Sequence, residues 1–248
     1  MEWHEHDGVR WLEADLPGAR VAFSTRMGGV SEPPFDTLNL AILTGDDRAA
    51  VRANRERLAA ALTLEPGRVV MGRQVHGAEI ARHDAPQEPS PYAIPGSPIP
   101  DVDGHVVGEP GLAPLVLVAD CLPVALVGSQ GVAMLHCGWR GLAAGIIASG
   151  VAAVQAQSAA VGPGIGPCCY EVGSEVLERF TDLGVGVARG RMLDLAEIAR
   201  RRLRQARVSE VQTAGLCTSC ESELFFSHRR DGDRTGRQGG LVWLEGEG

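Results

Sequence analysis

Two apolar runs in the middle of the chain are the feature that most constrains its fold. They lie in the segment LVLVADCLPVALVGSQGVAMLHCGWRG, residues 115–141. The turn GSQG at 128–131 predicts that 121–127 and 132–136 form a β-hairpin. Apolar runs without polar alternation are typical of buried strands, and we expect two or three such strands between Val106 and Leu135.

Three polar side chains interrupt these buried strands. Asp120 and Cys121 break the first run, and His136 ends the second. Burial of such groups without partners costs several kcal/mol. A metal ion, a catalytic pair or a hydrogen-bond network must therefore satisfy them.

Shorter patterns on either side predict a mixture of helices and strands. Residues 46–62 begin with two aspartates and place Val51, Leu58 and Leu62 on one helical face. Six prolines between 84 and 100 exclude a regular element and favour a surface excursion. We expect further strands at 19–26, 211–216 and 240–244, helices at 141–157, 171–180 and 193–206, and a strand, a turn at Gly77 and a return strand within 68–80. Elements without strict alternation are typical of an α+β fold in one domain.

Composition excludes several classes of function. The 248 residues carry a formal charge of −8, which argues against a nucleic-acid partner and against an anionic membrane surface. All 23 basic residues are arginine, so Schiff-base lysine chemistry and a Walker lysine are excluded. We expect a cytoplasmic protein with free thiols, because the start is polar and acidic, no apolar stretch could span a membrane, and six cysteines do not make a disulfide framework in so long a chain.

His76, Cys121 and His136 form the first candidate constellation. Three such ligands from different strands suit Zn²⁺ or copper, and three protein ligands with an open fourth position are typical of catalytic zinc. A buried thiol with two hydrogen-bonded histidines is the alternative. His105 in DVDGH is a fourth candidate ligand, although a turn histidine beside aspartates is more often exposed.

The same residues also allow a hydrolase without metal. Cys121 would be a thiolate nucleophile with His136 as its base, helped by the positive charge of Arg140. Asp120 would orient an imidazole or brace the turn.

The remaining cysteines form two clusters, in PCCY (Cys168, Cys169) and in CTSC (Cys217, Cys220). A zinc ribbon needs two CxxC knuckles, and adjacent cysteines do not make one. We therefore favour burial of these residues as small apolar side chains, with the CxxC as a redox-labile site, over the alternative of a second metal site.

Arginines beside glycines predict anion binding. The segment HCGWRGLAAG leads from a strand through glycines into a helix and carries Arg140. The segment SHRRDGDRTGR is either a solvated charge run or an ordered ligand loop. Candidate substrate contacts are Arg26, Ser24, Asn39, Arg140, Arg229 and Arg230, with Arg234 and Arg237 in the same loop as the last two.

The motifs FSTRMGGVS, LNL, RQVHG, DVDGH, ADCLPVAL, HCGWRGLAAGI, GPGIGPCCYEVG and FFSHRRDGDRTGR occur in this order. In this combination the sequence resembles the YfiH/YlmD-type laccase-domain family, also called multicopper polyphenol oxidase and later purine nucleoside phosphorylase/adenosine deaminase. The resemblance covers residues from about 20 to 244.

The resemblance implies one domain over 1–248 with an α/β/β/α layered fold and mixed sheets, similar to the deamidase domain of cytotoxic necrotizing factor toxins. Within this domain, residues 1–18 are expected to form a mobile N-terminal segment. It also implies a metal on His76, Cys121 and His136. The family commonly has alanine where this chain has Cys137, which places a second thiol near the site.

From this resemblance we expect a zinc-dependent purine nucleoside phosphorylase with adenosine deaminase-like activity on adenosine, inosine or methylthioadenosine. Its partners would be a nucleoside and phosphate, and Asp120 or Asp103 would move protons or support a ligand histidine. The alternatives are a copper (Cu²⁺) polyphenol oxidase, a Cys–His hydrolase or peptidoglycan-precursor editing factor, and a non-catalytic nucleoside-binding protein. A blue-copper oxidase with four coppers needs more histidines, in paired motifs, than the seven present.

Overall fold

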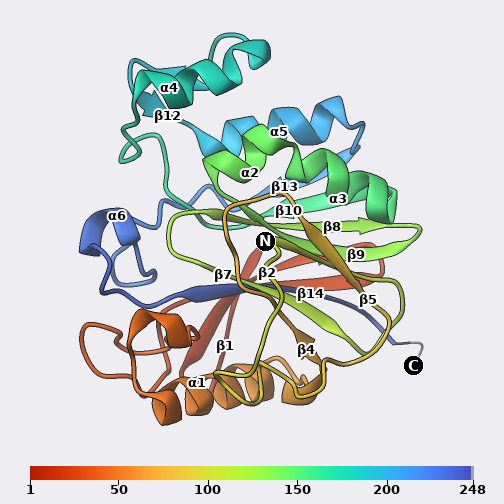
Figure 1. Cartoon of the computed structure of the whole chain (residues 1–248), viewed down its shortest axis with the longest axis vertical. Helices are drawn as coiled ribbons and strands as arrows, with labels where there is room; N and C mark the ends of the chain where they lie inside the picture. The colour runs from red at the N-terminus through yellow and green to blue at the C-terminus, as the bar shows by residue number, and fades with distance from the viewer. Residues whose placement is uncertain (247–248) are drawn as a thin grey trace.

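A computed structural model describes residues 1–246, and its elements are arranged in four layers (Figure 1). Helix α1 (Arg48–Ala61) covers one sheet. Helices α2 (Trp139–Ala144), α3 (Ile146–Val154) and α5 (Leu195–Gln205) cover the other, and the two sheets face each other. The predicted α+β class and the α/β/β/α order of layers are therefore confirmed.

Each large sheet has six strands and is mixed. The strands of the first follow one another in the order β1 (Glu2–His6), β2 (Val9–Leu16), β3 (Ala19–Ser24), β14 (Gln238–Leu244), β7 (Ala113–Val118) and β4 (Val69–Val70). The strands of the second follow one another in the order β13 (Glu210–Thr213), β10 (Ala156–Val161), β8 (Leu122–Gly128), β9 (Gly131–Cys137), β6 (Gly104–Val107) and β5 (Ile80–His83). The pairs β4–β7, β5–β6 and β10–β13 are parallel.

The remaining elements are short and lie around these layers. They are α4 (Ser174–Leu177), α6 (His228–Asp231), the ribbon β11 (Ala188–Arg189) and β12 (Met192–Leu193), and the 3-10 helices η1 (Ile42–Thr44), η2 (Pro66–Arg68) and η3 (Glu178–Leu183). No helix within the described part of the chain has both the length and the apolar character that crossing a bilayer requires.

The β8–β9 hairpin is the predicted hairpin, and its position explains its unbroken apolar sequence. Gly128 pairs with Gly131 at the turn. Val124 and Leu126 belong to the core under the helices, whereas Ala125 and Val127 belong to the core between the sheets. Side chains of a strand alternate between two faces, and both faces of this hairpin are covered.

Helix α1 forms where its sequence pattern predicts. Asp47 caps its first turn by accepting a hydrogen bond from the backbone N–H of Ala50. Val51, Leu58 and Leu62 are buried, the last two in the core against the first sheet. The proline-rich segment 84–100 is irregular, as expected, and runs over the surface beside this helix, with Tyr92 as its buried anchor.

The N-terminal residues differ from the expectation of a mobile segment. Residues 11–16 of strand β2 pair with the whole of β3, and β1 pairs with β2. Leu12, Ala14 and Leu16 are buried between the sheets. The polar residues that suggested mobility face outward on the sheet edge, and the apolar residues between them hold the segment in place.

Residues 68–80 also differ from the expectation, because they do not form a strand with a return strand. Strand β4 pairs with β7 in the first sheet, whereas β5 pairs with β6 in the second. The connection between them, 71–79, therefore crosses from one sheet to the other. His76 lies in this crossing, which brings it to the end of the sandwich.

The helix predicted for 141–157 is divided. Gly145, with φ of 89°, ends α2 and begins α3. The chain reverses direction after α3, and strand β10 begins at Ala156, before the end of the predicted helix. The left-handed conformation at Gly145 costs little for glycine and explains the break.

Candidate metal centre and active-site cavity

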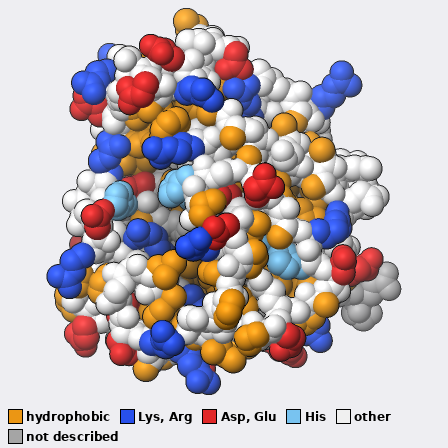
Figure 2. Space-filling model, viewed as in Figure 1, with side chains coloured by type: hydrophobic (Ala, Val, Ile, Leu, Met, Phe, Trp, Pro, Cys, Tyr) orange, Lys and Arg blue, Asp and Glu red, His pale blue; other side chains and the backbone are white. Residues whose placement is uncertain are grey.

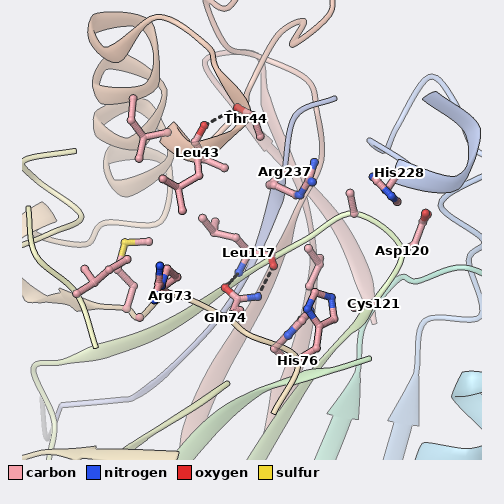
Figure 3. A pocket seen from close by; sticks show the side chains of 18 of the residues that line it. Leu43, Thr44, Arg73, Gln74, His76, Leu117, Asp120, Cys121, His228 and Arg237 are labelled. Carbon is pink, nitrogen blue, oxygen red and sulfur yellow. Dashed lines mark hydrogen bonds between the residues drawn. The ribbon is translucent and has the colours of Figure 1, made fainter. Parts of the chain in front are cut away.

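His76, Cys121 and His136 converge at one end of the two sheets. One donor atom from each lies within 4.8 Å of the others. His76 comes from the crossing between sheets and Cys121 from the turn before β8 (Figure 3). His136 comes from β9. The ring centroids of the two histidines are 4.9 Å apart, edge to face. The sequence-predicted donor set is thus brought together.

Local backbone geometry places these donors. His76 has a φ of 61° and Asp120 a φ of 93°, both in the left-handed region that few non-glycine residues adopt. Gly138 lies beside the donors, and a Cβ atom there would be 2.9 Å from Cys121 Sγ and 3.2 Å from a carbon of the His76 ring. The close approach of strand end and donors therefore requires glycine at 138.

Asp103 holds two of the three donor residues in place through hydrogen bonds. Its side chain is fully buried and accepts hydrogen bonds from the backbone N–H groups of Val75, His76 and Gly77. Its Oδ1 is also 2.8 Å from Nδ1 of His136. A carboxylate that holds one ring nitrogen of a ligand histidine fixes the ring and leaves Nε2 for the metal.

Cys121 and His136 shift each other's ionisation. Burial alone would raise the pKa of the Cys121 thiol, but the positive charge of His136 and hydrogen bonds from His136 and His76 lower it. Burial alone would lower the pKa of His136, but the Cys121 thiolate and Asp103 raise it. The site therefore favours a thiolate, which is the form that binds metals.

Asp120 is close to the donors but acts as a brace. Its Oδ1 accepts a hydrogen bond from the Thr218 hydroxyl at 2.7 Å, and its Oδ2 accepts one from the backbone N–H of Arg229, also at 2.7 Å. Asp120 thereby connects the Cys121 turn with two later segments of the chain. It also borders the cavity, at the end nearer α6 (Figure 3).

A cavity of about 670 Å³ opens beside the three donors. This volume lies within the range of small-molecule sites. Its wall is largely apolar and aromatic, with Met71, Leu117, Trp139 and Tyr170 among the lining residues. Figure 2 shows arginine and histidine side chains grouped around a hollow on this face.

Five arginines line the cavity, and three of them, Arg140, Arg229 and Arg237, come from the segments that follow β9 and precede β14. The guanidinium of Arg140 is 4.5 Å from the centre of the Trp139 ring, and no described residue accepts a hydrogen bond from it. The guanidinium of Arg229 lies 4.9 Å from the Tyr170 ring centre. Arg237 projects toward the cavity from the segment before β14 (Figure 3). These positive groups can bind an anion beside the metal ligands.

Comparison with known proteins agrees with this geometry. The sequence matches the family model described as multi-copper polyphenol oxidoreductase laccase over residues 20–245. The chain belongs to this family. The match includes all three donors and Asp103, and the predicted family is thereby confirmed.

Named relatives of the family are similar over nearly their whole length. Purine nucleoside phosphorylase YfiH of Escherichia coli (strain K12) is 37% identical over 240 residues, which cover 92% of this chain and 94% of that protein. A purine nucleoside phosphorylase of Streptomyces coelicolor is 38% identical over 245 residues, 92% of this chain and 96% of that protein. The crystal structure of YlmD from Geobacillus stearothermophilus has a TM-score of 0.89 at 35% identity and covers 98% of both chains.

Four of the expected substrate contacts lie outside the cavity lining. Ser24 is buried and accepts a hydrogen bond from the backbone N–H of Gly239. Arg26 donates to Asp36 and stacks on Phe226.

The other two also hold the chain in place. Asn39 accepts hydrogen bonds from the backbone N–H groups of Ala41 and Arg237, and both of these residues line the cavity. Arg230 pairs with Asp231 and donates to backbone carbonyls of Thr218 and Phe225. These four side chains make hydrogen bonds within the protein and do not belong to the cavity lining.

Several cavity residues were not singled out by their sequence patterns. Tyr170 follows the two cysteines of PCCY, and Gln74 stands two residues before His76. The Gln74 amide hydrogen-bonds both the N–H and the carbonyl of Leu117 (Figure 3). Arg237 was noted only as one of several loop arginines. The only available signal was their position within motifs whose other residues carry chemistry.

His105 does not join the metal donors and is not exposed. It is fully buried on β6, and its Nδ1 lies 3.0 Å from Nε2 of His83. Its other nitrogen, Nε2, has no hydrogen-bond partner among the described residues. Cys137, the departure from the family pattern, is fully buried in the core under the helices and is not one of the clustered donors.

The expectation that the other four cysteines are buried as small apolar side chains is wrong for two of them, and the other two pack only partly against the core under the helices. Cys168 and Cys220 are exposed, and Cys169 and Cys217 are partly buried. Their sulfurs lie together in a second cluster.

Proposed function

We propose that the protein is a zinc-dependent purine nucleoside phosphorylase with adenosine deaminase-like activity on adenosine, inosine or methylthioadenosine. The observation that carries the proposal is the convergence of His76, Cys121 and His136 on the wall of a cavity that also presents an unpaired arginine. The names of the two enzyme relatives above support phosphorolysis of a purine nucleoside.

The donor set fits Zn²⁺. Two imidazoles and a thiolate with cavity space on the remaining side correspond to a catalytic zinc site with three protein ligands. Asp103 supports the fit because it holds Nδ1 of His136. When bound, Zn²⁺ would supply a Lewis acid that polarises a substrate oxygen or lowers the pKa of water.

The surrounding residues account for binding. Trp139 and Tyr170 can stack on a purine, and Met71 and Leu117 can exclude water from its faces. Arg140, whose guanidinium is free, can bind phosphate through two parallel hydrogen bonds. Arg229 stays close to the donors because Asp120 fixes its backbone.

The test combines metal analysis with product analysis. Freshly purified protein would be incubated with adenosine with and without phosphate, and the products separated by chromatography. We expect adenine only when phosphate is present and inosine without it. His76→Ala should contain one zinc fewer per chain than the wild type and should lose both activities, whereas the matched control His6→Ala, on exposed strand β1, should keep both.

Copper in this site with oxygen consumption on phenols would instead favour the polyphenol oxidase that the family description names. Two facts argue against a multi-copper centre. The chain has seven histidines. The second donor cluster of the described residues consists of cysteines alone.

A metal-free hydrolase is the second candidate, and one observation favours it. Cys121, His136 and Asp103 are ordered as nucleophile, base and orienting acid, with the pKa of Cys121 lowered by its neighbours. Alkylation of Cys121 that destroys an activity unaffected by chelators would support the hydrolase, including one that edits peptidoglycan precursors. Nucleoside binding without any turnover would contradict both enzymes.

A further inference from the structure

The second cluster consists of Cys168, Cys169, Cys217 and Cys220, called here the four-cysteine cluster. Their Sγ atoms all lie within 4.8 Å of one another. The Sγ of Cys220 is 3.4 Å from that of Cys168 and 3.5 Å from that of Cys169. Four sulfurs bound to one Zn²⁺ at about 2.3 Å lie about 3.8 Å apart in a tetrahedron. The two Cys220 separations lie within 0.4 Å of this value, and no pair of the four sulfurs is more than 4.8 Å apart.

The topology explains why cysteines so distant in sequence meet. Strands β10 and β13 are parallel neighbours, so both end at the same edge of the second sheet. The chain continues beyond each strand, and Gly164 forms a further parallel bridge with Cys217. The loop after β10 carries Cys168 and Cys169, and the turn after β13 carries the other pair.

The backbone around the cluster has features of a metal-binding turn. The N–H of Gly166 donates to Cys217 Sγ at 3.2 Å, and the N–H of Cys220 closes the turn on the Cys217 carbonyl at 3.1 Å. A Cβ atom at 166 would lie 3.2 Å from the Cβ atom of Cys217 on the other loop, so glycine permits the two loops to approach.

Exposure adds an independent argument. Cysteine is among the residues most often buried, yet Cys168 and Cys220 are exposed, and all four thiols are free. No two of them are bonded in a disulfide. Cys169 and Cys217 pack partly against the core under the helices, but the two exposed thiols gain nothing from apolar burial, and their contact with the other sulfurs points to a bound ion.

We propose that the four-cysteine cluster is a closed, structural Zn²⁺ site, separate from the centre on His76, Cys121 and His136. Zn²⁺ is the metal that tetrahedral sites of four thiolates typically hold, and a site with four protein ligands has no open position for chemistry.

The site would fix one wall of the cavity. Thr218, inside the CTSC turn, donates to Asp120, the neighbour of Cys121. Arg230 donates to the carbonyls of Thr218 and Ser219 and so ties the turn to α6. On the other loop, Tyr170 follows Cys169 directly and stacks against Arg229. A metal that joins both loops thus holds the side chains that border the substrate space.

The test uses a protein in which the first centre is removed, the double variant His76→Ala/His136→Ala. We expect one zinc per chain by elemental analysis, and after Co²⁺ exchange the visible bands of a tetrahedral tetrathiolate. Addition of Cys168→Ser/Cys220→Ser should remove the zinc and the bands. Ser219→Ala, in the same turn but without loss of a thiol, should retain both.

A second measurement needs no variant. In the native wild-type protein, the exposed thiols of Cys168 and Cys220 should resist iodoacetamide until a strong chelator is added, as judged by peptide mass spectrometry. The proposal would be overturned if the His76→Ala/His136→Ala variant contained no zinc, or if it contained iron in place of zinc. It would also be overturned by disulfides among the four cysteines, or by immediate alkylation of the wild-type protein without chelator.

Discussion

Asp103 Oδ1 lies 2.8 Å from His136 Nδ1, and the same fully buried carboxylate binds three consecutive backbone N–H groups around His76. One side chain therefore positions two of the three candidate metal donors. Burial raises the pKa of Asp103, but the hydrogen bonds from His136 and Gly77 outweigh it and keep the carboxylate ionised.

Replacement of this carboxylate should weaken metal binding. Asp103→Asn preserves the shape but removes the charge that orients His136, so we expect the Kd for Zn²⁺ at the first centre to rise about 10- to 100-fold. Chelator competition measures it. Asp101→Asn, which removes an exposed partner of Arg73, is the control and should leave the Kd unchanged. Equal affinities in the two variants would contradict the role of Asp103.

Gly138→Ala should disturb the donors by steric contact. The added Cβ would lie 2.9 Å from Cys121 Sγ, too close for both to keep their positions. We expect at least about tenfold weaker metal binding at this centre, because small displacements of ligands are costly. Gly67→Ala, where a Cβ meets nothing within 4 Å, is the matched control. Unchanged metal content in Gly138→Ala would show that the loop adjusts freely.

Acid should destabilise the fold through His105. Burial, followed by the neighbouring His83, lowers the pKa of His105 to about 3 against an ordinary value of 6.5. Below pH 6.5 the unfolded chain takes up a proton that the folded chain refuses, so stability falls as the pH falls from 6.5 toward 3. This residue should contribute a loss of about 2 kcal/mol between pH 7 and pH 5.

Urea unfolding at both pH values tests this contribution. His105→Leu should lose that part of the pH dependence, whereas His6→Gln, at an exposed strand, should keep it. The same slope in wild type and His105→Leu would refute the assignment.

Arg140 should act on phosphate more than on the nucleoside. Loss of a charge-assisted hydrogen bond costs about 1.5–3 kcal/mol, so Arg140→Gln should raise the KM for phosphate about 10- to 100-fold. Deamination, which uses no phosphate, should change little. Arg52→Gln, on the exposed side of α1, serves as control. If both reactions decline equally in Arg140→Gln, the residue does not select phosphate.

Local patterns were sufficient for much of the fold. The β8–β9 hairpin, helix α1 and strand β3 form where periodicity, a capping aspartate and a turn predict them. These elements depend on interactions between residues near each other in sequence. The motif order was sufficient to predict the family and the donor set His76, Cys121 and His136.

Long-range packing decided the rest. The sequence by itself could not show that β4 and β5 belong to different sheets, that Asp103 lies behind His136, or that Arg26 and Arg230 bind backbone groups instead of facing the cavity. It could not show that Cys168 and Cys220 meet, because only the parallel pairing of β10 with β13 brings their loops to one edge. Residue types and local spacing determine which groups carry chemistry, whereas strand order and register determine which of them touch, and these are set by burial of apolar faces over the whole chain.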